Sequence, residues 1–353
     1  MKGVKAMSTS NIQKFNLSQD EIINNILPQF NCRNASIEEI KVKNTDKQRA
    51  VYKVTALDNS VYCLKKVYYN ESTLLFIYSV VEWLYRNDIK VARFLPSKDN
   101  KRFIEYKNML FIFTPWLEGT KFNYDNFDDV VKASKNLAKL HSVTKDFFPI
   151  DGSLMKTGYD DLYISLDKHG KQLTECYNKA RTINDDFSKI FMSTYNDNMT
   201  LFNKCLNLSH SINLDNLSRS ICHGDYVNKN ILMNSNGEIC LIDFDKCCMN
   251  FSATDISYFL RRMLKRENTK WNLDITKRCL YEYNLIIHLG ADDIAYIFAY
   301  IIFPQKYWRL SRDYYNNINK ANKYAFCNLL TKVNMQCKYQ LQFMTSLTSE
   351  FNL

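Results

Sequence analysis

The chain contains 353 residues, of which 46% are hydrophobic and 24% are charged, and its formal net charge is +10. A chain of this length is expected to form two lobes, and its apolar content excludes an intrinsically disordered protein. The positive charge occurs in short doublets without a long basic tract. We therefore expect a folded protein with a weak affinity for anionic ligands and no nucleic-acid-binding module.

The sequence also disfavours a zinc-binding protein and a membrane-spanning or secreted protein. Eleven cysteines include no CxxC pair and no Cys/His set at zinc spacing, so we expect reduced core residues. The longest apolar run, 294–303, has about half the length of a membrane span, and the N-terminus lacks the apolar segment of a secretory signal. The expectation is a protein made in the cytoplasm without a membrane span.

The first third of the chain predicts a small β-rich lobe over 17–117, preceded by a disordered polar tail over 1–16. A leading helix is expected over 17–30, and a second helix with an apolar stripe over 71–86. Alternating apolar and polar residues predict five strands in one sheet, at 37–42, 50–55 and 61–67 and as a pair within 101–117.

After Glu118-Gly119 the pattern becomes mainly helical, which predicts a larger helical lobe over 118–353. Helical spacing of apolar residues is found at 127–141, within 155–220, at 255–266, 274–289 and 293–303, and from 321 onward.

The most informative segment of the helical part is His223-Gly224-Asp225, followed by Asn230 and by Ile242-Asp243-Phe244-Asp245. Phosphoryl transfer requires a carboxylate near the attacking hydroxyl and oxygen ligands for the Mg²⁺ on the phosphates. Asp225 can be that carboxylate, and Asn230 and Asp243 are oxygen donors of the kind that Mg²⁺ accepts. These residues predict the centre of an ATP-dependent phosphotransferase.

A β-hairpin is predicted between Asn230 and Asp243, because two short apolar runs flank Asn236-Gly237. Asn-Gly favours a type I′ turn, in which both central residues have positive φ. A two-residue turn at Asn236-Gly237 fixes the pairing of the two strands and places Asn230 opposite Asp243. Their Cβ atoms would then lie about 5 Å apart, so the two side chains could share one cation. A longer loop or a bulge would change this register.

A kinase-type site also uses a strand lysine on the phosphates, paired with a glutamate of a helix. Lys65 fits the first role, with a surface charge at a strand edge as the alternative. Glu71 and Glu82 are the candidate partners, one at each end of the 71–86 helix. The first β-turn, 44–49, contains no glycine, although a loop that covers phosphates normally uses glycine for close backbone approach.

The adenine base needs backbone donors at the junction of the two lobes. Pro115 has no N–H, so Trp116 or Leu117 is expected to make this contact.

The run from His223 to Asn230 resembles the HGDxxxxN loop of the aminoglycoside phosphotransferase and choline kinase superfamily, a branch of the protein-kinase-like fold. Ile242–Asp245 resembles the metal-binding strand end of that superfamily, and Leu137–His141 is similar to its LAxLH helix. Thr254-Asp255-Ile256 resembles the segment whose aspartate braces the catalytic loop, and an ordinary acid in the first turn of a helix is a compatible alternative.

This resemblance implies an α+β fold of the bilobal protein-kinase-like class, with a small β-rich N-lobe and a larger, mainly helical C-lobe. It implies Asp225 as the catalytic base, Asn230 and Asp243 as metal ligands, and His223 and Asp255 as supporting residues. The implied cofactors are ATP and Mg²⁺, and the implied partners are a nucleotide and a hydroxyl acceptor.

A narrower resemblance is to the CotS-type spore coat proteins of endospore-forming bacteria, and it implies synthesis in the mother cell and deposition in the coat beside other coat proteins. The segments that carry it are Leu74–Ile77, Asp243–Cys247, Arg261-Arg262, Lys270–Asn272, Phe303–Trp308 and Tyr314-Tyr315.

Three functions remain open, of which an active, spore-coat-associated phosphotransferase is preferred. The second is an inactive kinase-fold scaffold of the coat, which the glycine-free turn and the unassigned glutamate favour. The third is a metabolic small-molecule kinase of the choline or aminoglycoside type. A cationic acceptor of such a kinase would meet carboxylates, for which Asp160-Asp161 and Asp185-Asp186 are candidates.

Overall fold

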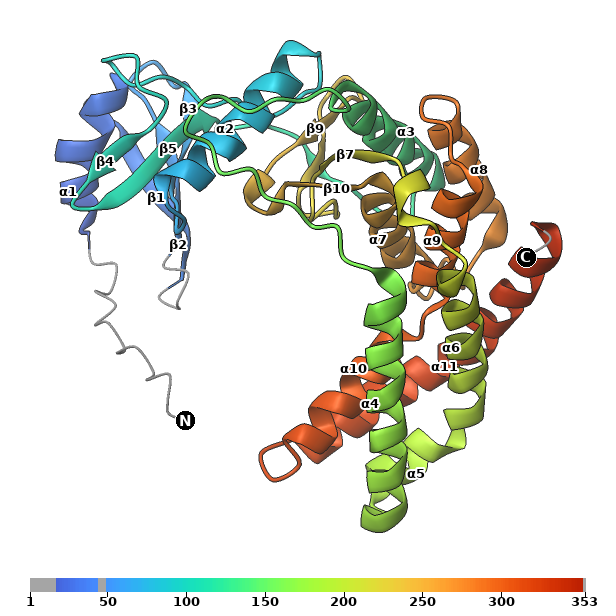
Figure 1. Ribbon diagram of the computed structural model, residues 1–353. Coiled ribbons are helices and arrows are strands. Elements are labelled where there is room, and N and C mark those ends of the chain that lie inside the picture. Colours follow the sequence, from blue (N-terminus) through green and yellow to red (C-terminus); the bar gives the residue numbers. More distant parts are fainter. Residues whose placement is uncertain (1–16, 44–48, 352–353) are drawn as a thin grey trace, which may run out of the picture. The chain divides into compact units, whose positions relative to one another are not determined.

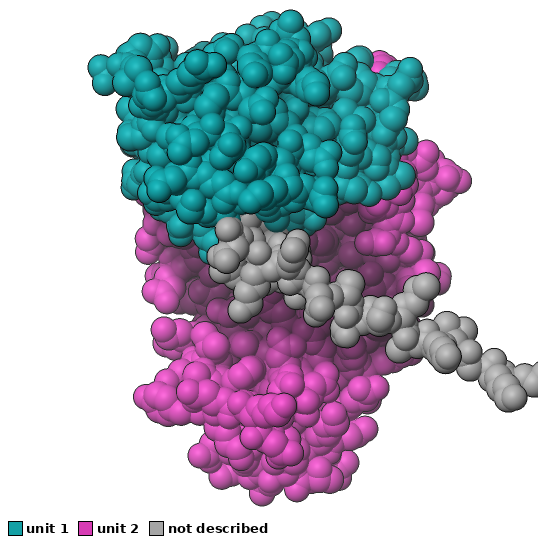
Figure 2. All heavy atoms as spheres, turned by 90° about the vertical axis from the view of Figure 1, so that its left-hand side faces the viewer, with its two compact units in different colours: residues 1–120, 148–155, 232–242 teal, residues 121–147, 156–231, 243–353 magenta. Residues whose placement is uncertain are grey.

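The computed structural model describes residues 17–43 and 49–351 (Figure 1). The chain forms two compact units, which Figure 2 colours separately. The first unit contains the chain up to Thr120 together with Phe148–Met155 and Leu232–Ile242, and the second contains the remainder. The predicted disordered tail and most of the glycine-free turn lie outside the described residues.

The first unit is built on an antiparallel five-stranded sheet, which confirms the predicted sheet. Its strand order is β1-β2-β3-β5-β4, and helix α2 (Glu71–Arg86) is inserted after β3. Asn70 begins this helix by accepting a hydrogen bond from the N–H of Thr73. The strands are β1 (Ser36–Lys43), β2 (Arg49–Thr55), β3 (Val61–Lys66), β4 (Ile104–Tyr106) and β5 (Met109–Pro115).

The segment before the sheet is helical, as expected, but it changes its winding along its length. A short α-turn, α1 (Gln19–Glu21), continues as a π-helix (Ile22–Ile26) and then as a 3₁₀-helix (Leu27–Phe30). Its apolar residues pack on one face of the sheet. The fully buried members of this core include Ile22, Ile26, Leu27, Ala50, Val54, Leu64 and Phe111.

The predicted hairpin is present, but its turn and register differ from the prediction. It consists of β8 (Ile231–Met233) and β9 (Ile239–Leu241), and a small strand, β6 (Thr120–Lys121), extends its sheet in the order β6-β8-β9. The N–H of Asn234 donates to the carbonyl of Glu238 at 3.0 Å, and only Gly237 of the loop has positive φ.

This pattern is a three-residue loop with glycine in the left-handed position, which is the next most common hairpin connection after the two-residue turn. Continued outward, its register shifts the partner of Asn230 by one residue from Asp243 to Ile242. The predicted Asn230–Asp243 pairing is therefore wrong, because the side chain of Asn234 accepts from the N–H groups of Asn236 and Glu238 and stabilises the longer loop.

The second unit is mainly helical, in agreement with the predicted fold class. Asparagine or aspartate side chains accept a backbone N–H at the start of several of its helices, as N-caps do: Asn126, Asp161, Asp185, Asn272 and Asn322. The helices are α3 (Phe127–Val143), α4 (Leu162–Ile183), α5 (Asp186–Ser193), α6 (Tyr195–His210), α7 (Ser252–Leu264), α8 (Leu273–Asn284), α9 (Ala291–Ile302), α10 (Gln305–Asn316) and α11 (Lys323–Glu350).

A two-stranded antiparallel sheet supports the loop between its strands. It pairs β7 (Arg219–Cys222) with β10 (Cys248–Phe251), and Cys222 lies opposite Cys248. His223-Gly224-Asp225, the HGD segment, follows β7 directly, and Asp243-Phe244-Asp245 lies shortly before β10. No helix of the described chain is long and apolar enough to cross a membrane.

Candidate active site

The HGD loop turns sharply after β7, and glycine is required at its centre. Gly224 has φ of +71°, and a Cβ atom at this position would lie 2.4 Å from the carbonyl oxygen of Lys246. Residues with a Cβ atom rarely adopt this backbone conformation, and there is no room for a Cβ atom at this position. Glycine therefore lets the HGD loop lie directly against the backbone that follows Asp243.

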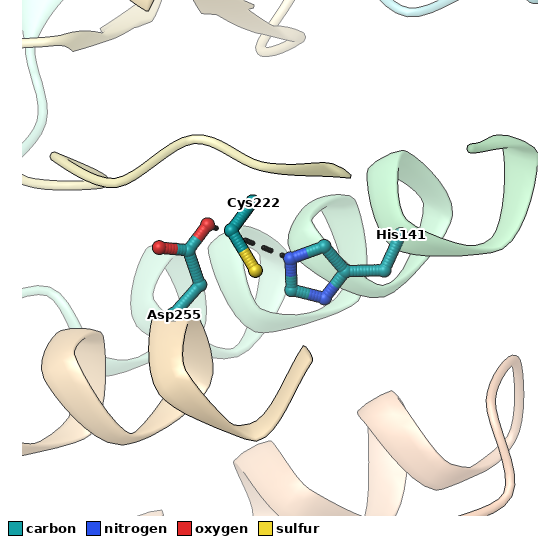
Figure 3. A group of neighbouring side chains, drawn as sticks. All are labelled: His141, Cys222 and Asp255. Carbon is teal, nitrogen blue, oxygen red and sulfur yellow. Dashed lines mark ion pairs between the residues drawn. The ribbon is translucent and has the colours of Figure 1, made fainter. Parts of the chain in front are cut away.

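Asp255 holds this loop from the first turn of α7. Its Oδ2 accepts the N–H of His223 at 2.5 Å, and its Oδ1 accepts the N–H of Gly224 at 3.1 Å. The ring of His141, on α3, lies 3.5 Å from the same carboxylate (Figure 3). The Nδ1 atom of His141 shares a hydrogen bond of 2.6 Å with the hydroxyl of Tyr283. Asp255 is thus both a first-turn acid and a carboxylate that hydrogen-bonds the loop.

His141, Cys222 and Asp255 bring their ligand atoms within 4.8 Å of one another, a spacing that raises the question of a metal site (Figure 3). Both carboxylate oxygens of Asp255 already accept backbone N–H groups. Burial raises the pKa of the Cys222 thiol well above its ordinary value, whereas a metal binds the thiolate. The group therefore serves as a hydrogen-bonded support of the loop, and its donors do not suit Mg²⁺.

Asp225 is buried, and two lysines surround its carboxylate. Its Oδ2 lies 2.8 Å from Nζ of Lys229 and 3.5 Å from Nζ of Lys246. Burial alone would raise the pKa of Asp225, but the hydrogen bond from Lys229 and the charge of Lys246 hold that pKa below its ordinary value. The carboxylate is therefore ionised at neutral pH and can accept a hydrogen bond from a hydroxyl group.

Asn230 is fixed by the same loop. Its Nδ2 donates to the main-chain carbonyl of Asp225 at 2.9 Å, and its own N–H donates to the carbonyl of Val227 at 2.8 Å. Because the amide nitrogen is used in this way, the side-chain oxygen is the atom of Asn230 that can bind a cation.

Asp243 ends the hairpin in a left-handed conformation, with φ of 67° and ψ of 63°. Such a conformation is uncommon for a residue other than glycine, and non-glycine residues held in it cluster at functional sites. The following residue, Phe244, packs its ring against that of His223, with centroids 4.5 Å apart. The oxygen donors of Asn230 and Asp243 fit the ligand preference of Mg²⁺, which keeps several waters when it binds to proteins.

Lys65 lies in the central strand β3 of the first unit, between Val51 of β2 and Ile112 of β5. Its side chain is only 8% exposed. This burial argues against a surface charge at a strand edge and is compatible with a phosphate-binding role.

Neither candidate glutamate forms an ion pair with Lys65 among the described residues. Glu82 binds Arg86 and Arg93, each at 2.9 Å, and Glu71 is exposed at the first turn of α2. The helix glutamate of a kinase-type pair is therefore engaged by arginines or turned to solvent in this chain.

At the expected adenine contact, the backbone N–H of Trp116 donates to the carbonyl of Val61 at 3.0 Å. This N–H extends the sheet and is not available to a nucleotide base. The candidate donor narrows to Leu117.

Several residues of the site were not among the predicted ones, namely Lys229, Lys246, His141 and Tyr283. Lys229 follows Asp225 by four residues, and that spacing is the one sequence signal that points to it. His141 ends the LAxLH-like segment, but that pattern does not indicate its contact with Asp255. Tyr283 belongs to a separate helix, α8, and only the packing of the helices brings its hydroxyl to His141.

The acidic doublets proposed for a cationic acceptor have structural roles. Asp161 caps α4, and Asp185 caps α5 and accepts the hydroxyl of Tyr314 at 2.5 Å. Asp160 and Asp186 are exposed. The doublets therefore do not form a carboxylate cluster for a cation.

The sequence matches a known protein family, and the fold is similar to that of several solved structures. Residues 44–278 match the model of the phosphotransferase enzyme family. The fold is similar to that of an aminoglycoside phosphotransferase from Alicyclobacillus acidocaldarius, with a TM-score of 0.75 and 18% identity over 92% of this chain and 94% of that one.

Two solved structures with bound ligands also share the fold. Spectinomycin phosphotransferase, in complex with ADP and spectinomycin, has a TM-score of 0.59 at 15% identity over 94% of this chain and 100% of that one. Amicoumacin kinase, in complex with AMP-PNP and Ca²⁺, has a TM-score of 0.58 at 14% identity over 94% of each chain.

Proposed function

The chain belongs to the phosphotransferase enzyme family, and we propose that it transfers the γ-phosphate of Mg²⁺-bound ATP to a hydroxyl group of a small acceptor. The observation that carries this proposal is the HGD loop itself. It combines a buried, ionised Asp225 with an Asn230 side chain whose amide nitrogen is already engaged. Two relatives of the same fold are described with ADP or AMP-PNP, which supports a nucleotide as the phosphoryl donor.

Asp225 orients the acceptor hydroxyl and takes its proton as the oxygen attacks the γ-phosphorus. Its lowered pKa suits this role, because the transition state of phosphoryl transfer is loose and positioning matters more than base strength. Asn230 and Asp243 would hold Mg²⁺, which supplies charge neutralisation on the phosphate oxygens. Lys65 is proposed to bind a phosphate, and the N–H of Leu117 is proposed to contact the base.

We place this activity in the spore coat on the strength of the CotS-type resemblance. The aromatic segments that carry it are packed inside the helical unit. The ring centroids of Trp308 and His169 lie 3.8 Å apart, and Tyr314 stacks on Phe187 with ring centroids 3.9 Å apart. These aromatic residues therefore belong to the core of the helical unit. Such a packing role does not distinguish an enzyme from a structural protein.

A scaffold without turnover is the second candidate, and one observation favours it. Glu82 is held by Arg86 and Arg93, so the helix glutamate that would orient Lys65 is not available. In this case the coat would assemble normally from a protein that carries both Asp225→Ala and Asp243→Ala.

The test of the enzyme is phosphoryl transfer from radiolabelled ATP to a panel of hydroxyl compounds, with wild type and Asp225→Asn compared. Loss of a general base lowers rates by about 10²–10⁴-fold, so we expect a loss of this order with an unchanged unfolding temperature. Lys189→Met, in an exposed pair with Asp186, is the control and should retain full activity. Equal turnover in wild type and Asp225→Asn would reject the proposed role of Asp225.

A further inference from the structure

The helical unit contains a cavity of about 220 Å³ that the proposed mechanism does not use. Side chains of α4, α7, α9 and β10 line it, and the size suits a small head group rather than a whole drug-sized ligand. Its polar wall is formed by Asn250, Thr254, Arg261, Tyr296 and Tyr300, with the exposed Asp160 also in the lining.

The cation in this wall, Arg261, is 8% exposed and has no carboxylate partner among the described residues. Its guanidinium donates to the hydroxyl of Tyr300 at 2.8 Å and lies 4.0 Å from the centre of that ring. Burial lowers the pKa of Arg261. A buried charge without a counter-ion is costly, so an anion in the cavity would relieve this cost.

Four other cations gather beside Arg261. Arg262 lies in the last turn of α7, Lys265 caps the C-terminus of that helix, and Lys306 and Arg309 belong to α10. Arg261 is the member that lines the cavity, whereas Lys265, Lys306 and Arg309 are exposed beside it. Lys265 is exposed, but partial desolvation and the charges of these neighbours lower the pKa of Lys265 to about 8. Within the part of the chain that the structure describes, none of the four has a carboxylate at ion-pair distance. We call these five residues the cationic cluster.

The other titratable groups of the lining do not neutralise the cluster. Burial, with the charges of Arg312 and Lys168, lowers the pKa of His169 to about 4, so its imidazole is neutral at physiological pH. Asp160 is the single carboxylate in the described lining, and it is exposed to water.

The cationic cluster also extends toward the catalytic carboxylate. Burial lowers the pKa of Arg262, but its hydrogen bond to Tyr258 and nearby negative charge, including that of Asp225, raise it above its ordinary value. Thr254, in the cavity wall, precedes Asp255, which holds the HGD loop. Helix α7 therefore contributes Thr254 and Arg261 to the cavity wall and Asp255 to the support of the HGD loop.

We propose that the phosphoryl acceptor is a hydroxylated anion whose carboxylate or phosphate group is held by the cationic cluster at this cavity. The inference rests on the proposed phosphotransfer and specifies its acceptor class. The acceptor oxygen forms a bond to the γ-phosphorus, the bond from that phosphorus to the β,γ-bridging oxygen breaks, the hydroxyl proton passes to Asp225, and ADP leaves. The acidic doublets that a cationic acceptor would need serve instead as helix caps or solvent-exposed side chains.

The first experiment measures anion binding without nucleotide, with inorganic phosphate and gluconate as probes and chloride at equal ionic strength as the reference. We expect phosphate or gluconate to bind wild type, and Lys265→Glu to raise the Kd at least about 10-fold, which corresponds to about 1.4 kcal/mol. Lys338→Glu, an exposed lysine of α11 outside the cluster, makes the same change in net charge and should leave the Kd unchanged.

Arg261→Met is a second variant, and because Arg261 is buried its folding is checked by circular dichroism. Equal loss of binding in Lys265→Glu and Lys338→Glu, or no binding to wild type, would overturn the proposed anion site. Binding of phosphate but not gluconate would assign a phosphate group to the acceptor, and the reverse would assign a carboxylate.

The same titration in Asp243→Ala separates this inference from the proposed function. Phosphate binding that persists in Asp243→Ala, together with no response of wild type to Mg²⁺-ATP, would reject the phosphotransferase and keep the anion site. A response to Mg²⁺-ATP without any anion binding would reject the acceptor class alone. In a transfer assay, labelling of cationic aminoglycosides but not of hydroxy acids or sugar phosphates would also overturn it.

Discussion

At the scale of single residues, the charge state of Asp225 depends on two lysines. The hydrogen bond from Lys229 and the charge of Lys246 offset the effect of burial and lower the pKa of this carboxyl. A lowered carboxyl pKa stabilises the folded protein above the unfolded-state pKa, and this stabilisation is lost as the pH falls through the folded-state pKa. The same carboxyl is proposed to act as the base, so replacing Lys229 should also change the pH-dependence of activity.

Lys229→Met removes the hydrogen bond that lowers the pKa of Asp225 and leaves the burial that raises it. We expect the acid limb of the pH–rate profile to move to higher pH, while the rate at pH 8 changes little. Lys189→Met serves again as the control, because its pair with Asp186 is exposed. An acid limb at the same pH in wild type and Lys229→Met would show that Lys229 does not set this pKa.

Gly224 and Gly237 offer a matched comparison, because both have positive φ. A Cβ at Gly224 would lie 2.4 Å from the carbonyl oxygen of Lys246, whereas a Cβ at Gly237 would meet nothing within 4 Å. Gly237→Ala should cost about 1 kcal/mol of unfolding free energy for the conformation alone. Gly224→Ala should cost at least about 2 kcal/mol more and abolish activity, measured by urea unfolding. Equal costs would mean that the close approach is unimportant.

At the scale of elements, helix α7 positions the HGD loop through the first-turn residue Asp255. Asp255→Ala leaves the N–H groups of His223 and Gly224 without an acceptor. Each buried donor left unsatisfied costs about 1–3 kcal/mol, so we expect this variant to lower the unfolding free energy by about 2–6 kcal/mol. Asp292 is its control, since it also accepts two hydrogen bonds in the first turn of a helix, α9, but is less buried.

Asp292→Ala should cost only about 1 kcal/mol, the usual net value of a hydrogen bond. A similar small cost for both alanine variants would show that Asp255 does not hold the loop.

At the scale of the whole molecule, regular patterns in the sequence were sufficient to predict the sheet and most helices. The alternation in β1 to β3 and the apolar stripe of α2 predicted these elements within one or two residues. Helix α10 is not among the predicted elements. It directly follows Pro304, and its buried stripe is aromatic: Tyr307, Trp308, Tyr314 and Tyr315. Aromatic residues have only moderate helix propensity, so tertiary packing decides this helix.

The residues of the HGD loop were predictable, because their chemical types and spacing are local in the sequence. Their surroundings were not, because they depend on long-range packing. Asn234 lengthens the hairpin loop by a hydrogen bond that the Asn-Gly signal does not reveal. Glu82 binds Arg93, eleven residues away, instead of Lys65. The supporting contact of His141 with Asp255 joins residues from two distant helices.

The central claim is that the protein binds Mg²⁺-ATP through Asp243, and thermal unfolding tests it most directly. Wild type and Asp243→Ala are heated with and without Mg²⁺-ATP, with ATP plus EDTA as the metal-free control. A ligand at about 100 times its Kd adds roughly 2.7 kcal/mol, which raises the unfolding temperature of a protein of this size by several degrees. We predict a Mg²⁺-dependent rise in wild type that Asp243→Ala abolishes; no rise in wild type at millimolar Mg²⁺-ATP would contradict the account.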